Sequence, residues 1–386
     1  MAESPFFPPE EYGRRLHDLR AAMQARDLDG CLISAPENIY YLCGLSHLGF
    51  FAYHLLVVPR RGEMVLIARA MERVTVEALV TNAGFIGYAD SADPVQITCA
   101  ALREIGLTAG RAGIEKENLF LPPRISEGVA ACLPDVALVD ISGLVDSLRQ
   151  QKSAQELAYT RQAAAVADAM MAAARNAAAP GVNELEVAAE VHRAMILAGG
   201  TYPGFGPFIR STPRLGQEHR TWQDRVLQRG DVLFVELAGC IRRYHAAMGR
   251  LIFIGEAPPG TQEMETICLE AFAAVIRALR PGARARDVYA AWQDRVDAAG
   301  LSHYHRHHCG YLIGIGFPPS WVGGSQVVGL RHDSDLTLRE GMVFHLMSWL
   351  MDSGRDGNYF VSDTATVTAD GCEVLTTAPQ QLHIAH

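Results

Sequence analysis

Apolar residues in the first 150 positions recur alternately with the period of a helix and in short strand-like runs. Residues 10–26 place Leu16, Leu19 and Met23 on one stripe and arginines off it, which predicts an amphipathic helix. Short apolar runs that predict strands follow at Gly30–Ile33, His54–Val58 and Met64–Ala68. This alternation, which continues to about residue 148, predicts an α/β domain with helices packed on a sheet.

The pattern changes after the polar stretch Gln150–Ser153, and we place a domain boundary there, giving domains 1–152 and 153–386. An alanine-rich helix is expected at 154–179, followed by a break at Pro180-Gly181 and a second helix capped by Asn183. The same pattern returns at Pro281-Gly282, at a constant offset of 101 residues, which indicates an internal duplication. Each helix pair precedes strand-like runs, at Val232–Ala238 and Arg250–Ile254, then at Val343–Leu346 and Thr364–Thr368. The second domain is therefore expected to be α+β, with helices covering a curved antiparallel sheet.

The composition of the chain argues against several classes of protein. Of 386 residues, 49% are hydrophobic and 20% charged, and the net charge of −9 argues against a nucleic-acid partner or a polybasic membrane-surface protein. No run approaches the roughly 20 apolar residues of a membrane-spanning helix. The acidic, proline-containing start Met1–Pro5 argues against a secretory signal. Eight scattered cysteines without a C-x-x-C pair are typical of reduced thiols. We expect a soluble cytoplasmic protein with no membrane partner.

Four motifs resemble the creatinase, aminopeptidase P and prolidase family. In chain order they are the segments Pro36–Gly44, Asp231–Ala238 with Tyr244 and Arg250, Glu340–Phe344, and Ser362–Thr364 with residues 367–376. The resemblance covers nearly the whole chain. It implies a creatinase-like α/β N-terminal domain, a catalytic domain with the duplicated pita-bread fold, and a homodimer.

Peptidases of this family hold two divalent metals with two Asp, one His and two Glu, because hard cations need carboxylate oxygens. The resemblance places these five ligand positions on Glu236, Ala247, Tyr311, Met347 and Ser362. Only Glu236 is still a carboxylate. We therefore expect no dinuclear metal site, no metal-dependent peptide hydrolysis and no cofactor.

The histidine-rich segment 303–308 is considered as a replacement metal site and is not expected to be one. His303, His305 and His307 alternate as they would on a strand, but no carboxylates nearby complete a ligand set. The simpler interpretation is a polar strand that lines a pocket or a subunit contact.

Creatinase is the metal-free precedent in this family, and it keeps a His ahead of the first long strand, which corresponds to His219 here. The segment His307–Trp321 resembles that of the ectoine hydrolases. This resemblance implies a hydrolase that opens the cyclic amidine ring of ectoine to N-acetyl-2,4-diaminobutanoate, which a downstream deacetylase would consume. It implies 5-hydroxyectoine as a second substrate.

An amidinium is planar and carries two N–H donors, so one facing carboxylate can bind it. Glu236 is the expected anchor, or a nucleophile that forms a covalent intermediate. His219 is the expected acid/base, or it activates water directly. The remaining substrate-binding candidates are Tyr311, Trp321, Phe317, Tyr244 and His308. The substrate carboxylate needs a partner, for which Arg210, Arg306 and backbone groups stay open.

Other interpretations remain at this point. Glu236 could be a structural carboxylate paired with Arg250 or Arg243, and His219 a plain loop residue. The protein could be a creatinase-like amidinohydrolase acting on another guanidino or amidino compound. It could also be a non-catalytic pita-bread binding module.

Overall fold

The computed structural model describes residues 6–324 and 326–386, in two compact units, Met1–Arg149 and Gln150–His386, that we treat separately. The segment Met1–Pro5, which argues against a secretory signal, lies outside the described residues. None of the helices in the described part is both long enough and apolar enough to cross a membrane.

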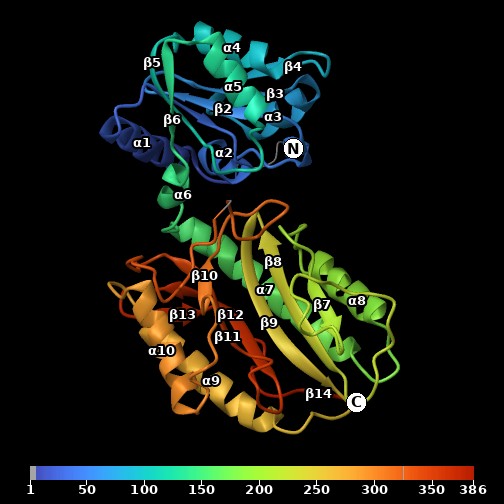
Figure 1. The fold of residues 1–386 in the computed structure, drawn as a ribbon. Helices are drawn as coiled ribbons and strands as arrows, with labels where there is room; N and C mark the ends of the chain where they lie inside the picture. The colour runs from blue at the N-terminus through green and yellow to red at the C-terminus, as the bar shows by residue number, and fades with distance from the viewer. Residues whose placement is uncertain (1–5, 325) are drawn as a thin grey trace. The chain divides into compact units, whose positions relative to one another are not determined.

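The first unit is a six-stranded mixed sheet with strand order β4-β3-β2-β1-β5-β6 (Figure 1). Its helices are α1 (Pro9–Ala25), α2 (Pro36–Cys43), α3 (Arg73–Leu79), α4 (Pro94–Glu104), α5 (Pro123–Cys132) and α6 (Leu144–Leu148), with 3-10 turns η1 (Leu48–Phe51) and η2 (Ala70–Glu72). Its strands are β1 (Gly30–Ile33), β2 (Leu55–Pro59), β3 (Met64–Arg69), β4 (Ala83–Tyr88), β5 (Gly110–Ile114) and β6 (Val136–Asp140). The predicted first helix and the three predicted strands are confirmed to within a residue or two.

The second unit has an eight-stranded sheet whose main path runs β10-β11-β12-β9-β8-β7, with every neighbouring pair on this path antiparallel. Its helices are α7 (Ala154–Ala177), α8 (Glu184–Leu197), α9 (Thr261–Ala278) and α10 (Ala285–Ala298). Its strands are β7 (Phe208–Ser211), β8 (Val232–Ile241), β9 (Tyr244–Ile254), β10 (Gly310–Leu312), β11 (Val343–Leu350), β12 (Tyr359–Val367), β13 (Cys372–Val374) and β14 (Ile384–Ala385). Strand β13 pairs with β12, and β14 runs parallel to β9.

The predicted duplication of a helix, a break and a second helix is present. The second helices of the two halves, α8 and α10, are both 14 residues long and begin 101 residues apart. Asn183 caps α8 as predicted, because its side chain accepts from the N–H of Leu185 while Glu186 completes a capping box. Figure 1 shows α7 beside the long β8–β9 hairpin and α9 beside β11 and β12, so each half covers its own strands with a helix pair.

Candidate active site

A carboxylate stands in the middle of the second sheet. Strand register aligns Phe208, Glu236, Gly249, Ser362 and Met347 side by side across β7, β8, β9, β12 and β11. Residues directly opposite each other on neighbouring strands point to the same face of a sheet. Three of the five positions at which the family resemblance places metal ligands, those of Glu236, Met347 and Ser362, therefore share one row on one face.

The packing of α7 determines which face this is. Leu233, Val235 and Leu237, which alternate with Glu236 along β8, join the apolar core that includes Met170 of α7. Glu236 therefore points away from α7. Beside Glu236, the Phe360 ring packs directly on the backbone of Gly249. A Cβ at position 249 would lie 2.3 Å from this ring, so there is no room for a side chain there.

The Glu236 carboxylate is nearly buried and lacks a hydrogen bond within the described part of the chain. The residue is 9% exposed, and Nδ1 of His345 lies 3.9 Å from its Oε1. Burial raises the pKa of Glu236 from its ordinary value of 4.5 to about 7, while the positive charge of Arg210 opposes that rise. Such a carboxylate can accept a cation or a proton near neutral pH.

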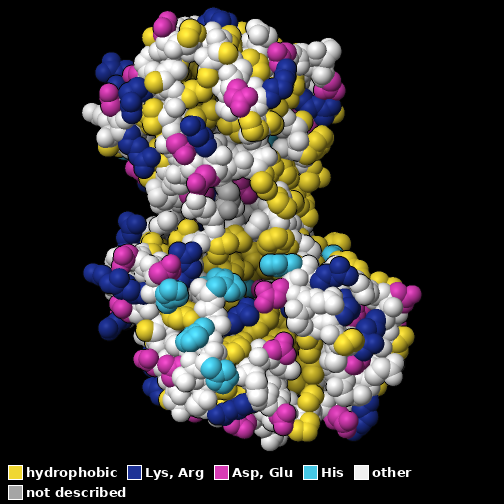
Figure 2. Space-filling model, viewed as in Figure 1, with side chains coloured by type: hydrophobic (Ala, Val, Ile, Leu, Met, Phe, Trp, Pro, Cys, Tyr) yellow, Lys and Arg dark blue, Asp and Glu magenta, His cyan; other side chains and the backbone are white. Residues whose placement is uncertain are grey.

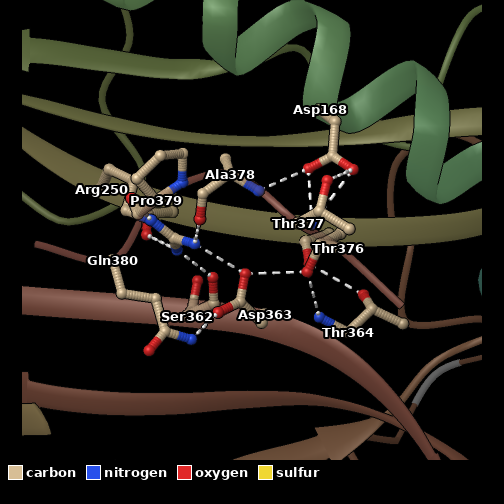
Figure 3. A network of polar contacts seen from close by, with 12 residues as sticks. Asp168, Arg250, Ser362, Asp363, Thr364, Thr376, Thr377, Ala378, Pro379 and Gln380 are labelled. Carbon is tan, nitrogen blue, oxygen red and sulfur yellow. Dashed lines mark hydrogen bonds and ion pairs between the residues drawn. The ribbon is translucent and has the colours of Figure 1, made fainter. Parts of the chain in front are cut away.

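Neither arginine suggested as a structural partner binds Glu236. Arg250 lies on the other face of the sheet, where its Nη2 donates to Oδ1 of Asp363 at 2.8 Å, within the polar network shown in Figure 3. Arg243 donates to the backbone oxygens of Tyr202 and Gly316. The interpretation of Glu236 as one half of a structural ion pair with either arginine is therefore wrong.

A chain of hydrogen bonds joins Tyr311 and His345, a neighbouring pair on β10 and β11, to Ser362 in the row of Glu236. Nε1 of Trp321 donates to the Tyr311 hydroxyl at 2.9 Å, which lies 2.9 Å from Nδ1 of His345, and Nε2 of His345 lies 2.8 Å from Oγ of Ser362. Burial lowers the pKa of His345 to about 3, so the ring is neutral and carries one proton. An indole only donates. The single proton of the His345 ring then lies on Nε2 and is donated to Ser362, while the unprotonated Nδ1 accepts a hydrogen bond from the Tyr311 hydroxyl, so each of these donors has an acceptor.

This chain occupies the place where the family resemblance puts metal ligands. Tyr311 and Ser362 stand at two ligand positions, and His345 bridges their hydroxyls. His345 was missed in the sequence because it is not at a ligand position. Its place on β11, two residues before Met347, is the signal that could have found it, since side chains two apart share a face.

His219 lies in the loop that follows β7. Its side chain is exposed, its backbone has a φ of 57°, and its ring lies 5.7 Å from that of Phe208, the row neighbour of Glu236. Next to it, Glu218 forms an ion pair with Arg306 at 3.1 Å. The structure thus places His219 at the edge of the candidate site and not in contact with Glu236.

Glu184, the first residue of α8, holds the start of this loop. Its Oε1 accepts from the backbone N–H of Ser211 at 3.0 Å, its Oε2 from that of Gln223 at 2.9 Å, and Arg214 pairs with it. Glu184 is fully buried. It therefore fixes both ends of the segment that carries His219.

His308 joins the site from the other side. Its ring lies 5.3 Å from that of Tyr311, and its Nδ1 is buried without a hydrogen-bond partner in the described structure. Burial lowers its pKa to about 3. Figure 2 shows histidine side chains gathered on this face of the second unit around apolar ones.

The expected polar strand at 303–308 is wrong, because β10 begins only at Gly310. The segment makes other contacts instead of strand pairing. Nε2 of His303 lies 2.8 Å from the backbone oxygen of Ser353, and the Tyr304 hydroxyl donates to the oxygen of Met351.

One predicted binding residue, Tyr244, is not brought to this cluster. Tyr244 is fully buried, and its hydroxyl donates to Oε1 of Glu156 on α7 at 2.7 Å, so it faces away from Glu236. Phe317 is buried with the Arg243 guanidinium 4.7 Å from its ring centroid. Trp321 does reach the cluster, and it packs edge-on against Phe205 at 4.8 Å.

The donor set does not fit two hard divalent cations. Ala247 and Met347 offer no oxygen ligand, and Tyr311 and Ser362 are already joined through His345. Across residues 6–324 and 326–386, no three His, Cys, Asp or Glu side chains gather so as to hold a metal ion.

Comparison with known proteins places these observations in a family. The profile of metallopeptidase family M24 matches residues 158–369, and that of the creatinase/prolidase N-terminal domain matches residues 15–151. An uncharacterized hydrolase/peptidase, y4tM, of Sinorhizobium fredii is 29% identical, covering 97% of this chain and 98% of its own. The ectoine hydrolase of Halomonas elongata is 28% identical over 98% of both chains.

Solved structures agree on the fold. The Xaa-Pro dipeptidase from Bacillus anthracis superposes with a TM-score of 0.84 at 22% identity, covering 97% of this chain and 99% of the other. The predicted creatinase-like N-terminal domain and pita-bread C-terminal domain are confirmed.

Proposed function

Because the chain belongs to metallopeptidase family M24, it is placed among hydrolases, and we propose that it hydrolyses the cyclic amidine ring of ectoine without a metal ion. The observation that carries this proposal is the Glu236 carboxylate, nearly buried on the sheet face that points away from α7 and free of hydrogen bonds within the described residues. The relative from Halomonas elongata, named as an ectoine hydrolase, supports the choice of substrate.

The chemistry of an amidinium matches this carboxylate. A delocalised cation with two N–H groups supplies the hydrogen bonds that Glu236 lacks, and a dry site strengthens such a pair. The aromatic rings of Trp321 and Tyr311 border the same site. The ring of ectoine would lie against these faces while Glu236 holds its nitrogens.

Two routes lead to N-acetyl-2,4-diaminobutanoate. In the covalent route a Glu236 oxygen bonds to the amidine carbon, one ring C–N bond breaks as its nitrogen takes a proton, and water then cleaves the adduct. In the other route His219 activates water, which attacks the same carbon while Glu236 only anchors the ring. His219 lies on a loop whose edge contacts Phe208, so it would reach the reacting atoms by movement of that loop.

The test is turnover by protein that has been stripped with a chelator and checked for metal content. We expect ectoine to yield N-acetyl-2,4-diaminobutanoate, followed by NMR, with no gain on adding Mn²⁺, Co²⁺ or Zn²⁺. Glu236→Gln should lose at least about 100-fold in kcat/KM, while the exposed Glu340→Gln serves as the matched control.

Other activities are measured in the same assay. Cleavage of Xaa-Pro dipeptides only with added metal would contradict the proposal and favour a peptidase. Urea release from creatine would favour a creatinase-like amidinohydrolase. Tight peptide binding without turnover, unchanged in Glu236→Gln, would favour a binding module.

We also propose, on the family resemblance, that the protein is a homodimer. Sedimentation velocity measures its mass, and a monomer across micromolar concentrations would contradict this.

A further inference from the structure

Four arginines of the second unit are less than a tenth exposed. Three of them bind a carboxylate, or several backbone carbonyls, through their terminal nitrogens: Arg214 with Glu184 and Thr221, Arg243 with Tyr202 and Gly316, and Arg250 with Asp363. These three are explained by the fold. The fourth, Arg210, is not.

Arg210 is a buried cation without a matching anion in contact. It is 1% exposed, and within the described chain its guanidinium makes one hydrogen bond, from Nε to the backbone oxygen of Leu215 at 3.0 Å. Its plane rests on Phe234, whose ring centroid lies 3.9 Å from Cζ. Both terminal nitrogens, with four N–H groups, thus have no protein acceptor there. A buried charge in this state is unfavourable unless something else pairs with it.

The position of Arg210 links it to the candidate active site. On β7 it lies opposite Phe234 of β8, and Phe208 lies opposite Glu236, so Arg210 and Glu236 point to the same face of the sheet. Two residues along a strand span about 7 Å, which is enough to hold a small ring between the two charged groups. Glu236 and Glu218 both attract Arg210 electrostatically, yet neither forms an ion pair with it in the described structure.

We propose that Arg210 binds the carboxylate of the substrate, so that the site selects small zwitterions carrying a cationic amidine and a carboxylate. A guanidinium fork and a carboxylate form two parallel hydrogen bonds, which the free terminal nitrogens of Arg210 can supply. The competing candidate, Arg306, is already paired with Glu218 at 3.1 Å and is partly exposed. The identity of the cationic half rests on the proposed function; the carboxylate half rests on Arg210 alone.

The experiment compares ectoine with 2-methyl-1,4,5,6-tetrahydropyrimidine, the same ring without its carboxylate. Arg210→Met should lower kcat/KM for ectoine by about 10- to 100-fold, mainly through KM, and change that for the bare ring by less than about 3-fold. Arg210→Lys should recover part of the loss. The exposed Arg277→Met on α9 is the matched control and should behave as wild type with both compounds. A merely structural role would lower the rate on both rings alike, and that result would overturn the proposal.

A second measurement separates this inference from the proposed function. Should wild type turn over neither ring, the proposed function fails, and Arg210 is then tested with acetate. Acetate should raise the melting temperature of wild type above that seen with equal chloride, and should not do so for Arg210→Met. The same response in wild type and variant would overturn the carboxylate site whatever the substrate is.

Discussion

The buried carboxylate of Glu236 should make the protein less stable, and replacing it should show by how much. Its pKa is raised from 4.5 to about 7 by burial, a difference equivalent to about 3 kcal/mol between the two protonation states. Between these two values the folded protein keeps a proton that the unfolded chain has lost. The free energy of unfolding therefore falls as pH rises from about 4.5 to about 7, and the full loss of about 3 kcal/mol is present above pH 7.

Glu236→Gln removes the charge and keeps the shape. We expect the variant to be more stable than wild type by about 2–3 kcal/mol at pH 8, and by less than about 1 kcal/mol at pH 5, where wild type is still protonated. The same variant should lose its activity on ectoine. Stability and activity would then change in opposite directions at one side chain, as expected of a group retained for function.

The intrinsic fluorescence of the protein gives a suitable assay. All four tryptophans lie in the second unit, so denaturant unfolding followed by their emission reports on the sheet that carries Glu236. Urea titrations of both proteins at pH 5 and pH 8 give the two differences. A loss of stability at pH 8, or an equal gain at both pH values, would refute the argument.

A matched control lies on the opposite face of the same sheet. Asp363 is also a buried carboxylate whose pKa is raised by burial, but it differs from Glu236 because it accepts from Arg250 and from Thr376 at 2.8 Å each and from Gln380 at 2.7 Å. Asp363→Asn leaves the Arg250 charge buried and without its partner, so we expect a loss of about 3–5 kcal/mol at both pH values. The same chemical change should thus stabilise one site and destabilise the other.

Three further predictions follow from the same geometry. Because Glu236 titrates near pH 7, kcat/KM for ectoine should rise with pH up to about 7 and then level off; a profile flat from pH 5.5 to 8 would contradict a role for its ionised form. Binding of a cationic amidine should release about half a proton per site at pH 7 and almost none at pH 8.5. Calorimetry in buffers of different ionisation enthalpy measures the number of protons released, and the variant His219→Ala is used because it is expected to slow turnover during the titration. His345→Leu leaves the hydroxyls of Tyr311 and Ser362 without their bridge, so unfolding by urea should show a loss of about 1–3 kcal/mol for each group left unpaired; unchanged stability would contradict the hydrogen-bond chain.

Much of the fold was readable from local sequence. The capping residue Asn183 and the break at Pro180-Gly181 mark the start of α8, and their repetition 101 residues later predicts the second helix pair. Such signals depend on the chemistry of a few adjacent residues, so they can be recognised without the tertiary structure. The expectation that no dinuclear metal site is present is also local, because it depends only on which side chains stand at the five motif positions.

The interior of the site was less predictable, because it depends on strand register. His345 and Arg210 belong to no motif, and each becomes part of the site only when β11 and β7 are aligned with their neighbours. The position of Tyr244, a predicted substrate-binding residue, was not predictable for the same reason. It sits in a motif next to the site in sequence, but the pleat of β9 turns it towards α7, where it binds Glu156.

Charge balance explains why one carboxylate remains where the family resemblance expects several. A cluster of carboxylates is stable around two divalent cations, but without them like charges at short range repel and raise one another's pKa. Alanine, tyrosine, methionine and serine at four of the positions remove that repulsion, and the Tyr311–His345–Ser362 chain fills the space with neutral groups that satisfy one another. Glu236 is then left with its positive neighbours at a distance and with no hydrogen bond in the described structure.

A substrate that brings both a cation for Glu236 and an anion for Arg210 would neutralise both buried charges in one binding event, whereas a substrate with only one charge would leave the other buried and unpaired. On this argument the preference for a zwitterion should exceed the sum of two separate contacts, and the double variant Glu236→Gln with Arg210→Met should bind the zwitterion less weakly than the two single losses added together predict.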